Sequence, residues 1–243
     1  MTTEYKREEM LICLVARLLA GVRYVAIGAL SPIPGAAALL TQATSATPVR
    51  VSFLQGRHNQ FTDGGRELFD AAGQGRIDAF FLGGVQIDGQ ANINLVGPGP
   101  YPHTTRRFSG SFGSALMYYV VPRVILFREE HSPRTLVQQV DFISAPGVSP
   151  PGVYRPGGPT ALVTNLAYFS FDRSRARFRL ESVHPGHTAE EVRGQTGFDF
   201  DCPEEVPTTP LPEPDRLDLL RGSIAKRMAD LYPEFHARVF AAA

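Results

Sequence analysis

Apolar residues recur every three or four positions in the first part of the chain. Met10, Leu14 and Leu18 share one face of this pattern, and Thr3 can act as an N-cap ahead of an acidic and polar first turn. The short apolar run at residues 23–29 has the composition of a buried strand. A helix followed by a buried strand is therefore predicted at the start of the chain.

Apolar and polar stretches continue to alternate as far as about residue 232. Further strands are predicted at residues 49–54, 78–82, 120–127, 140–143, 161–171 and 177–183. Further helices are predicted at residues 34–42, 67–72 and 215–232, with another beginning after Thr188, and the SPIPG segment at 31–35 is predicted to be a loop. Helices that alternate with short apolar strands indicate a three-layer α/β fold.

Two segments stand apart from this pattern. Residues 144–158 are rich in proline and glycine, which favours a surface loop. Residues 203–243 form a C-terminal tail that begins with proline and acidic residues and ends with the predicted final helix. A chain of 243 residues can bury one large core, so we expect a single domain over residues 1–243 that carries this loop and this tail.

The charge balance limits the choice of partners. Lys plus Arg and Asp plus Glu are 24 each, so no net charge draws the chain to nucleic acid or to a membrane surface. The apolar region at residues 10–40 is interrupted by Arg17, Arg23, Pro32 and Pro34, and it cannot supply a membrane span. The acidic N-terminus is not typical of a secretory signal. We expect a cytoplasmic protein with neither nucleic acid nor a membrane as a partner.

The cysteines and histidines do not form a metal-binding pattern. Cys13 lies in the first helical pattern as a small apolar residue, and Cys202 lies in the tail, so no disulfide is predicted. His184 and His187 lie on either side of a Pro-Gly turn, with no carboxylate at helical spacing beside them. No metal site is predicted.

Four arginines alternate with other residues near the strand predicted at 177–183, namely Arg173, Arg175, Arg177 and Arg179. Alternation at every second position places side chains on one face of an extended segment. A solvated strand or turn face is one interpretation, and a stripe that binds an anion is the other. The residues by themselves leave both open.

The chain lacks the short motifs of a P-loop, a dinucleotide site and a nucleophile elbow. It has glycines where predicted strands end, at Gly56 and at Gly83-Gly84, and a GSFG loop at residues 110–113. In open α/β sheets ligands bind outside the carboxyl ends of the strands, where backbone amides can hold a phosphate or an oxyanion. The residues therefore predict an α/β protein with an anionic ligand, and nothing more specific.

Five segments, in order, resemble motifs of the B-type subunits of glutaconate CoA-transferase and its relatives. GGVQIDGQANIN at residues 83–94 is similar to the family's GGAQID-x-x-GN-x-N, and RRFSGSFG at 106–113 is similar to a basic and aromatic stretch that leads into G-S-G-G. The other three segments are EHSPRTLVQQVDFISAPG (130–147), GPTALVTNLAYFSFD (158–172) and LESVHPGHTAEEVRGQTGFDFD (180–201). The resemblance to the B-type (beta) subunits of family I CoA-transferases covers nearly the whole chain.

This resemblance implies an open α/β/α sheet of the CoA-transferase (NagB/RpiA-like) type. It also implies an A-type partner subunit, in a heterodimer or heterotetramer, and an acyl-CoA thioester as substrate, with no cofactor held permanently. The family's nucleophilic glutamate follows the second strand, but this chain has Leu54 there, followed by Gln55 and Gly56. Leucine cannot attack a thioester. In this respect the chain resembles the B-type subunits of the hydrolases of steroid-ring degradation, which also lack the glutamate.

Three activities remain open: a hydrolase or C–C-cleaving enzyme, a CoA transferase with its nucleophile on the partner or on a carboxylate such as Glu67, and a non-catalytic acyl-CoA-binding or scaffold protein. No catalytic residue is predicted in this chain. Contact with the thioester or CoA is predicted for Gln55, Gly56, Gly83, Gly84, Gln86, Gly110, Ser111, Phe112 and Gly113. Phe112 replaces a family glycine and is expected to crowd its loop. His131 and Arg134 match family positions beside the active cleft or the subunit interface.

Overall fold

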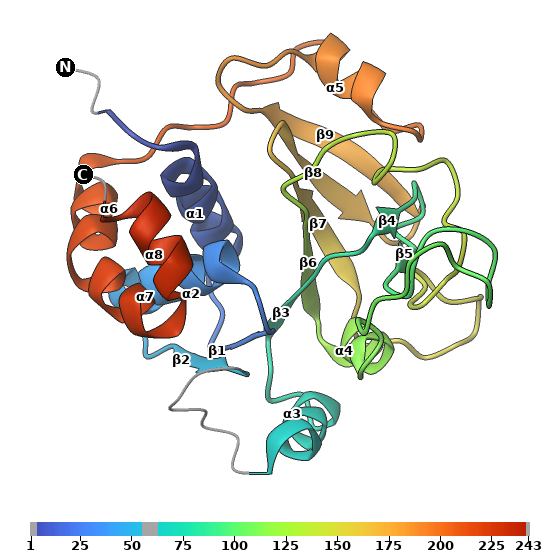
Figure 1. Ribbon diagram of the computed structural model, residues 1–243, viewed down its shortest axis with the longest axis horizontal. Helices are drawn as coiled ribbons and strands as arrows, with labels where there is room; N and C mark the ends of the chain where they lie inside the picture. The colour runs from blue at the N-terminus through green and yellow to red at the C-terminus, as the bar shows by residue number, and fades with distance from the viewer. Residues whose placement is uncertain (1–3, 55–62, 242–243) are drawn as a thin grey trace. The chain divides into compact units, whose positions relative to one another are not determined.

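Figure 1 shows the computed structural model of the chain, which describes residues 4–54 and 63–241. The chain divides into two compact units. Unit 1 comprises Met1–Leu68, Ile77–Ala79 and Pro210–Ala243, and unit 2 comprises Phe69–Arg76 and Phe80–Thr209. Strand β3 (Ala79–Leu82) begins in unit 1 and ends in unit 2, and α3 (Gly64–Gly73) likewise contributes to both. The expectation of a single domain stays a prediction.

Parallel strands form the sheet of unit 1. β1 (Tyr24–Ile27) pairs with β2 (Arg50–Phe53) on one side and with the first residue of β3 on the other. Helix α2 (Pro32–Thr44) connects β1 to β2 and packs against both. All four residues of β1 are buried, as expected for a strand in a parallel sheet covered by helices.

The remaining helices of unit 1 come from the two ends of the chain. Helix α1 (Arg7–Leu18) packs on α2. The C-terminal helices labelled in Figure 1 are α6 (Pro214–Leu219), α7 (Ala225–Leu231) and α8 (Pro233–Val239), and the π-helical turn η1 (Leu220–Ile224) joins α6 to α7. Glu9 is buried on α1, and its carboxylate accepts hydrogen bonds from Nε and Nη2 of Arg221 at 2.7 and 2.8 Å. This charge-assisted pair fastens the C-terminal helices to α1.

The sheet of unit 2 is mixed, with the strand order β3-β6-β7-β8-β9. β6 (Arg123–Phe127) and β7 (Pro159–Val163) are parallel, whereas β8 (Ala167–Asp172) and β9 (Arg177–Val183) continue the sheet in antiparallel fashion. A separate hairpin contains β4 (Gln86–Ile87) and β5 (Ile93–Asn94). Helix α4 (Ser114–Val120) precedes β6, and α5 (Ala189–Gln195) follows β9. Helices flanking a mixed sheet confirm the predicted α/β class.

Aromatic side chains form the core beside the antiparallel strands. On β8 and β9 buried and more exposed residues alternate, so Phe169 and Phe178 face the interior. The Phe169 ring lies 5.2 Å from that of Phe200, and the Phe178 ring lies 5.5 Å from that of Phe198. The segment after α5 is therefore held against the sheet by its two phenylalanines.

Most predicted strands occur where the pattern placed them. The runs at 23–29, 49–54 and 78–82 contain β1, β2 and β3, and 177–183 has the bounds of β9. The short helix predicted near residue 67 is present as α3, and Thr188 caps α5 by accepting the N–H of Glu191. Residues 144–158 contain neither a helix nor a strand.

Three strand predictions need correction. The run at 161–171 is two strands, because the Thr164 hydroxyl accepts the N–H groups of Leu166 and Ala167 and closes a turn. The run at 120–127 begins with the last residue of α4, so its strand starts only at Arg123. The strand at 140–143 is wrong, because the N–H of Asp141 donates to a side chain instead of to a sheet partner.

The helix boundaries also differ from the prediction. The loop predicted at 31–35 is wrong, because α2 already begins at Pro32, where the missing N–H of proline costs no helical hydrogen bond. The final helix predicted at 215–232 contains a π-helical turn and ends before Pro233, which starts α8. The first helix begins at Arg7, and the predicted cap Thr3 lies outside the described residues.

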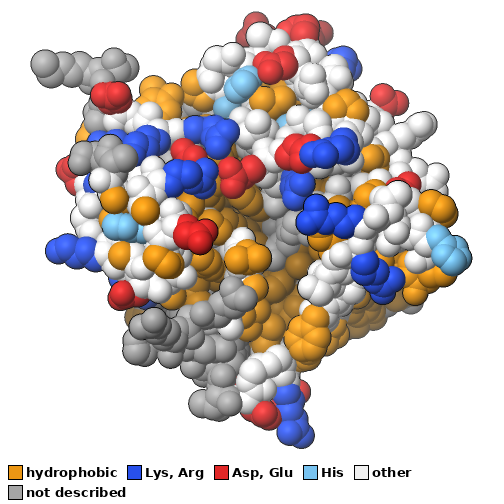
Figure 2. Space-filling view, viewed as in Figure 1, with side chains coloured by type: hydrophobic (Ala, Val, Ile, Leu, Met, Phe, Trp, Pro, Cys, Tyr) orange, Lys and Arg blue, Asp and Glu red, His pale blue; other side chains and the backbone are white. Residues whose placement is uncertain are grey.

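The surface charge agrees with the bulk composition. Within the described residues, no helix is long and apolar enough to cross a membrane. On the face shown in Figure 2, basic and acidic side chains are interspersed and do not gather into one field of a single sign. This distribution is consistent with equal numbers of basic and acidic residues.

Candidate functional site

The glycine pair after β3 lies at the carboxyl end of β6. A Cβ atom at Gly83 would lie 2.8 Å from the carbonyl oxygen of Phe127, the last residue of β6. At Gly84 it would lie 2.7 Å from the carbonyl oxygen of Gln86 and 3.0 Å from that of Asn94. Both positions therefore exclude any larger residue, because two backbone segments approach too closely. This edge of unit 2 is where an open α/β sheet binds ligands.

Gln86 belongs to a closed polar network beside these glycines. Its Nε2 donates to Oδ2 of Asp141 at 2.8 Å, and its Oε1 accepts from Nδ2 of Asn94 and from the N–H of Asp141. Asp141 also accepts the N–H of Gly99 at 2.7 Å. The amide of Gln86 thus has partners at both ends and orients the β4–β5 hairpin. The predicted contact between Gln86 and a ligand stays a prediction.

Asp88 and Asn92 fix the turn of the same hairpin. Oδ1 of Asp88 accepts the N–H groups of Gln90 and Asn92 at 3.1 and 3.0 Å. Oδ1 of Asn92 accepts the N–H of Gly147 at 3.1 Å, which ties the turn to the loop at 144–158. These side chains therefore satisfy backbone donors and stabilise the turn.

The GSFG loop is shaped by close packing at its two glycines. A Cβ at Gly110 would lie 2.9 Å from the carbonyl oxygen of Leu95. Gly113 has a φ of 65°, and a Cβ there would overlap the ring of Phe69. Ser111 and Phe112 between them are exposed. These two residues project from a loop that the glycines hold in place.

The structure revises the expectation for Phe112. Its side chain does not crowd the loop, because the residue is 78% exposed and its ring lies 5.5 Å from that of Phe69. An exposed aromatic residue beside Ser111 gives this loop an apolar surface next to a hydroxyl. The predicted contact of Ser111 and Phe112 with a ligand stays a prediction.

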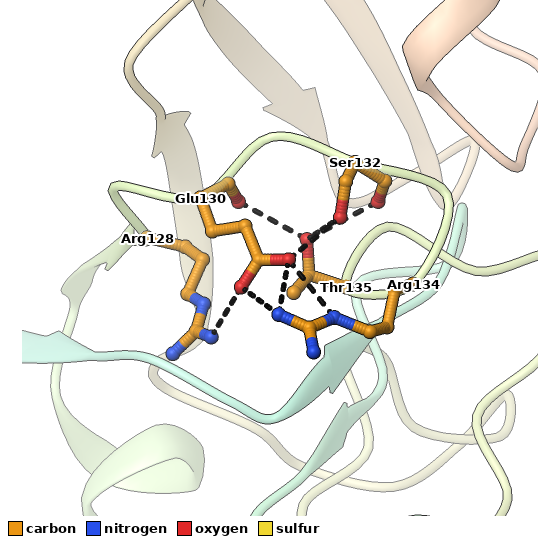
Figure 3. Close-up of polar contacts among 5 residues, drawn as sticks. All are labelled: Arg128, Glu130, Ser132, Arg134 and Thr135. Atoms are coloured by element: carbon orange, nitrogen blue, oxygen red, sulfur yellow. Dashed lines mark hydrogen bonds and ion pairs between the residues drawn. The ribbon is translucent and has the colours of Figure 1, made fainter.

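A charged cluster occupies the segment that follows β6 (Figure 3). Oε1 of Glu130 accepts from Nε and Nη2 of Arg134 at 3.1 and 2.8 Å and from the Ser132 hydroxyl at 2.8 Å. Oε2 accepts from Nη2 of Arg128 at 3.1 Å. Partial burial acts to raise the pKa of Glu130, but hydrogen bonds from Arg134, Ser132 and Arg128 outweigh it, so this pKa lies below its usual value.

The sequence pattern identified only part of this cluster. The family resemblance points to Arg134 but not to its partner Glu130, although a Glu and an Arg four positions apart give a signal of pairing. Because the Glu130 carboxylate is ionised and accepts several hydrogen bonds, its lone pairs are not free to attack a substrate. The Glu130 carboxylate is therefore better suited to orienting Arg128 than to acting as a nucleophile.

Two buried polar atoms at the ends of β6 and β7 lack partners among the described residues. They are Nε of Arg128 and Oδ1 of Asn165. The N–H of Arg128 donates to Val163 and the N–H of Asn165 donates to Glu129, so the two residues lie on adjacent chain segments. An unsatisfied buried donor and an unsatisfied buried acceptor are unusual in a folded protein, and a water molecule or a polar ligand group could satisfy them.

The two buried histidines are structural. Nδ1 of His131 lies 2.8 Å from the Thr164 hydroxyl, and Nε2 lies 2.8 Å from that of Thr196. His184 lies 2.8 Å from the Thr209 hydroxyl and 3.0 Å from the carbonyl oxygen of Thr164. Burial lowers the pKa of each histidine to about 4, so both rings are neutral at pH 7. With both nitrogens bonded, neither ring is available as a base.

Leu54, where the family resemblance implies a glutamate, lies in unit 1. Leu54 follows β2, is partly buried, and donates its N–H to the carbonyl oxygen of Ile27 at 3.0 Å. Gln55 and Gly56, which were predicted to contact the ligand, lie outside the described residues. Glu67 is in the first turn of α3, where its carboxylate lies 3.5 Å from the N–H of Asp63. The described part of the chain contains no cluster of three His, Cys, Asp or Glu side chains arranged to hold a metal.

The chain is an α/β protein of the open-sheet class. It has a mixed sheet, glycines where strands end, and polar loops beyond those ends. The model of the coenzyme A transferase family matches residues 20–195, so the chain belongs to the coenzyme A transferase family. The resemblance seen in the five sequence motifs is thereby confirmed.

Glutaconate CoA-transferase of Acidaminococcus fermentans is similar to this chain in both sequence and structure. Its B-type subunit is 32% identical over 151 residues, which are 59% of this chain and 56% of that protein. The glutaconate CoA-transferase structure from the same organism has a TM-score of 0.80 at 23% identity and covers 94% of this chain and 98% of its own. This likeness confirms the predicted three-layer fold of the CoA-transferase type.

Two further relatives bear names of different activities. The cholesterol ring-cleaving hydrolase IpdB subunit of Rhodococcus jostii is 30% identical over 166 residues, 67% of this chain and 65% of that protein. The structure of IpdAB from Rhodococcus jostii has a TM-score of 0.77 at 25% identity, covering 90% of this chain and 94% of the other. The decarboxylase AibA/AibB has a TM-score of 0.76, also at 25% identity and with the same coverage. The chain spans less than two thirds of the length of the curated relatives it matches.

Proposed function

We propose that the chain is the B-type half of a two-subunit enzyme that hydrolyses an acyl-CoA thioester or cleaves a carbon–carbon bond within its acyl group. The observation that carries this proposal is Leu54 at the end of β2, where the family resemblance implies a nucleophilic glutamate. An aliphatic side chain cannot form the covalent intermediates of CoA transfer. A carboxylate of an A-type partner would then activate water, while this chain provides the walls and polar groups of the site.

Two features of unit 2 support a substrate site in this chain. The first is the edge of the sheet at Gly83 and Gly84, together with the GSFG loop. In that loop the exposed Ser111 and Phe112 would contact the thioester or CoA, and Gly110 and Gly113 shape the loop. The second is the Arg128 guanidinium, which Glu130 holds at the end of β6 and whose Nε has no partner among the described residues. Gln86 would act by positioning the hairpin. A guanidinium at this edge suits a carboxylate or an oxyanion of the acyl substrate.

Water is the second substrate in the hydrolytic proposal. Its oxygen bonds to the carbonyl carbon as the C–S or ring C–C bond breaks, and its protons are shared between the new carboxylate and the leaving group. The CoA thioester is a substrate and not a permanently held cofactor. The partner, the heterodimeric or heterotetrameric assembly and the cytoplasmic location all belong to this proposal.

A transferase remains the second candidate because the relatives include the B-type subunit of glutaconate CoA-transferase. Its nucleophile would be a carboxylate of the partner or Glu67 of this chain. The position of Glu67 in the first turn of α3, near the N–H of Asp63, favours a helix-capping role for its carboxylate. The third candidate, a non-catalytic scaffold or acyl-CoA-binding protein, predicts no change in the thioester at all.

The test is to purify the chain with its A-type partner and to incubate the complex with a panel of acyl-CoAs and a carboxylic acid acceptor. Mass spectrometry follows the CoA products. We expect free acid or ring-opened product and no thioester between CoA and the acceptor. The Leu54→Glu variant restores a carboxylate and is expected to gain exchange, whereas the matched Leu54→Gln variant is not.

Each other result selects a different candidate. An acceptor–CoA thioester formed by the native complex would contradict the hydrolytic proposal, and loss of that product in Glu67→Gln would identify this chain's carboxylate as the nucleophile. Intact acyl-CoA throughout, with measurable binding, would favour the non-catalytic role. These outcomes are distinguishable because they differ in products and not only in rate.

A further inference from the structure

A cavity of about 490 Å³ opens to solvent within unit 2, and its lining includes neither Gly83 and Gly84 nor the GSFG loop. Its wall includes Arg175 and Arg177 from the hairpin that joins β8 to β9, and Arg193 from the last turn of α5. Phe198 and Phe200 of the segment after α5 also line it. We call this cavity the arginine pocket. Three cationic residues from two different parts of the fold thus contribute to its lining.

One carboxylate accepts hydrogen bonds from the first two guanidinium groups. Oδ1 of Asp201 accepts from Nε of Arg177 at 2.6 Å, and Oδ2 accepts from Nη1 of Arg175 at 2.5 Å. Asp201 is not among the residues that line the arginine pocket. Each guanidinium has five N–H donors, and one of them is used in each of these bonds. Donors therefore remain for a ligand, on side chains that are already oriented.

The turn that carries Arg175 is also fixed. Oδ1 of Asp172 accepts the N–H and the hydroxyl of Ser174 at 2.9 and 2.6 Å, and the N–H of Arg175 at 3.3 Å. Ala176 adopts a φ of 49°, which completes the tight connection into β9. A rigid turn lowers the entropy lost when Arg175 binds a ligand.

Arg193 supplies the third cation. Its guanidinium lies 5.6 Å from the centre of the Phe200 ring, and it forms no ion pair with a carboxylate in the described part of the chain. The lining also includes one acid, Asp199. Arg175 and Arg177 share the carboxylate of Asp201, whereas Arg193 lies near Glu190 on the same helix, where its charge helps to lower the pKa of that carboxyl.

The arrangement also separates the four alternating arginines of the sequence. Arg175 and Arg177 line the arginine pocket, whereas Arg179 lies outside the lining and pairs with Glu181 at 3.6 Å. Arg173 is exposed and is likewise absent from the lining. Arg173 and Arg179 therefore belong to a solvated face, whereas Arg175 and Arg177 belong to the lining of a pocket.

From this geometry we infer that the arginine pocket binds an organic ligand through a phosphate group. Oriented guanidinium forks match the oxygens of a phosphate, and a doubly charged phosphate suits several arginines better than a single carboxylate does. The volume of about 490 Å³ exceeds that of a bare phosphate ion and leaves room for an attached organic group. The side-chain amides of Gln90 and Gln138 in the lining, together with the two phenylalanines, would contact that group.

Two sources offer this chemistry: a phosphate of coenzyme A, or a separate phosphorylated metabolite. Coenzyme A and 3′-dephospho-coenzyme A differ by one phosphomonoester, and adenosine 5′-monophosphate carries a phosphate without the pantetheine arm. These three compounds, with inorganic phosphate, are the probes. Binding is measured without turnover, so the outcome does not depend on the proposed function.

The experiment is isothermal titration calorimetry on the full-length chain, alone and together with the A-type partner. Arg193→Ala is the test variant, because Arg193 forms no ion pair within the described residues whose loss would weaken the fold. Arg179→Ala removes the same charge outside the arginine pocket and is the matched control. We expect Arg193→Ala to weaken binding of a phosphate-bearing probe by roughly tenfold or more, while Arg179→Ala stays within about twofold of the native chain.

The probes separate the two sources. A preference for coenzyme A over its 3′-dephospho form, lost in Arg193→Ala, assigns the arginine pocket to the phosphate of the substrate. Binding of adenosine 5′-monophosphate that depends on Arg193, without that preference, assigns it to a free phosphorylated ligand. Equal affinities of the native chain and Arg193→Ala for every probe, or no binding of any probe, overturn the inference.

Discussion

The two buried histidines predict a pronounced loss of stability in mild acid. His131 and His184 have a pKa of about 4 in the folded chain, against a usual value of 6.5, because burial disfavours the charged ring. A lowered pKa means that the unfolded chain binds protons more tightly. Their neutral state is fully compatible with folding above pH 6.5, and stability falls as the pH drops from there towards 4.

The size of this effect follows from the pKa values. At pH 5 each histidine costs about 2 kcal/mol, so the pair costs roughly 4 kcal/mol relative to pH 7. Folded domains are stable by only about 5–15 kcal/mol, so the loss is a large fraction of the total. Carboxyl groups with a lowered pKa, such as Glu130 and Asp201, contribute their full stabilisation at every pH above their unfolded pKa near 4. Their contribution is therefore constant between pH 5 and 7 and does not offset the loss caused by the histidines.

The assay is urea denaturation at pH 7 and pH 5, followed by circular dichroism because the chain has no tryptophan. With an m-value of about 3 kcal/mol/M, the native midpoint should fall by roughly 1–2 M urea. The double variant His131→Gln/His184→Gln is less stable at pH 7 but should lose little more at pH 5. His103→Gln replaces an exposed histidine and should keep the native pH dependence. The reasoning is refuted if the double variant keeps the native difference between the two pH values.

Two substitutions test packing. Gly83→Ala places a methyl group 2.8 Å from the carbonyl oxygen of Phe127 and should cost about 1–3 kcal/mol in urea denaturation. Gly73→Ala, where the new methyl group meets nothing outside its own helix, is the control and should not destabilise the chain. An equal loss of stability in both variants would contradict the close approach at Gly83. Glu9→Gln removes the buried carboxylate that binds Arg221. We expect the free energy of unfolding at pH 7, measured in the same way, to fall by about 1–3 kcal/mol. An unchanged midpoint would show that this pair does not hold the C-terminal helices.

Gly110 is a predicted contact of acyl-CoA, but it is a poor position for testing that contact. Gly110→Val would place a branched side chain in a tightly packed loop. Because a Cβ there would lie 2.9 Å from the carbonyl oxygen of Leu95, the substitution also displaces the loop and mixes two effects. Ser111→Ala on the exposed part of the loop is the cleaner variant. If Ser111 contacts the ligand, this variant should bind acyl-CoA more weakly with an unchanged circular dichroism spectrum.

Local pattern was sufficient for elements whose limits are set by neighbouring residues. The apolar run before Gly83-Gly84 gave β3, and the cap at Thr188 gave α5, because burial and capping depend on adjacent side chains. The run at 161–171 failed because Thr164 bonds to its own backbone within an apolar stretch. The segment at 140–143 failed because a distant side chain, Gln86, takes the backbone donor of Asp141.

By itself, the sequence determined the family and the α/β class, because motifs and residue patterns need no coordinates. The tertiary structure decided which arginines of an even stripe face a cavity. Asp201, 24 residues from Arg177 along the chain, orients one pair, whereas Glu181 pairs with Arg179 on the same strand. Period-two alternation fixes the face of a strand, but only long-range packing determines what that face meets.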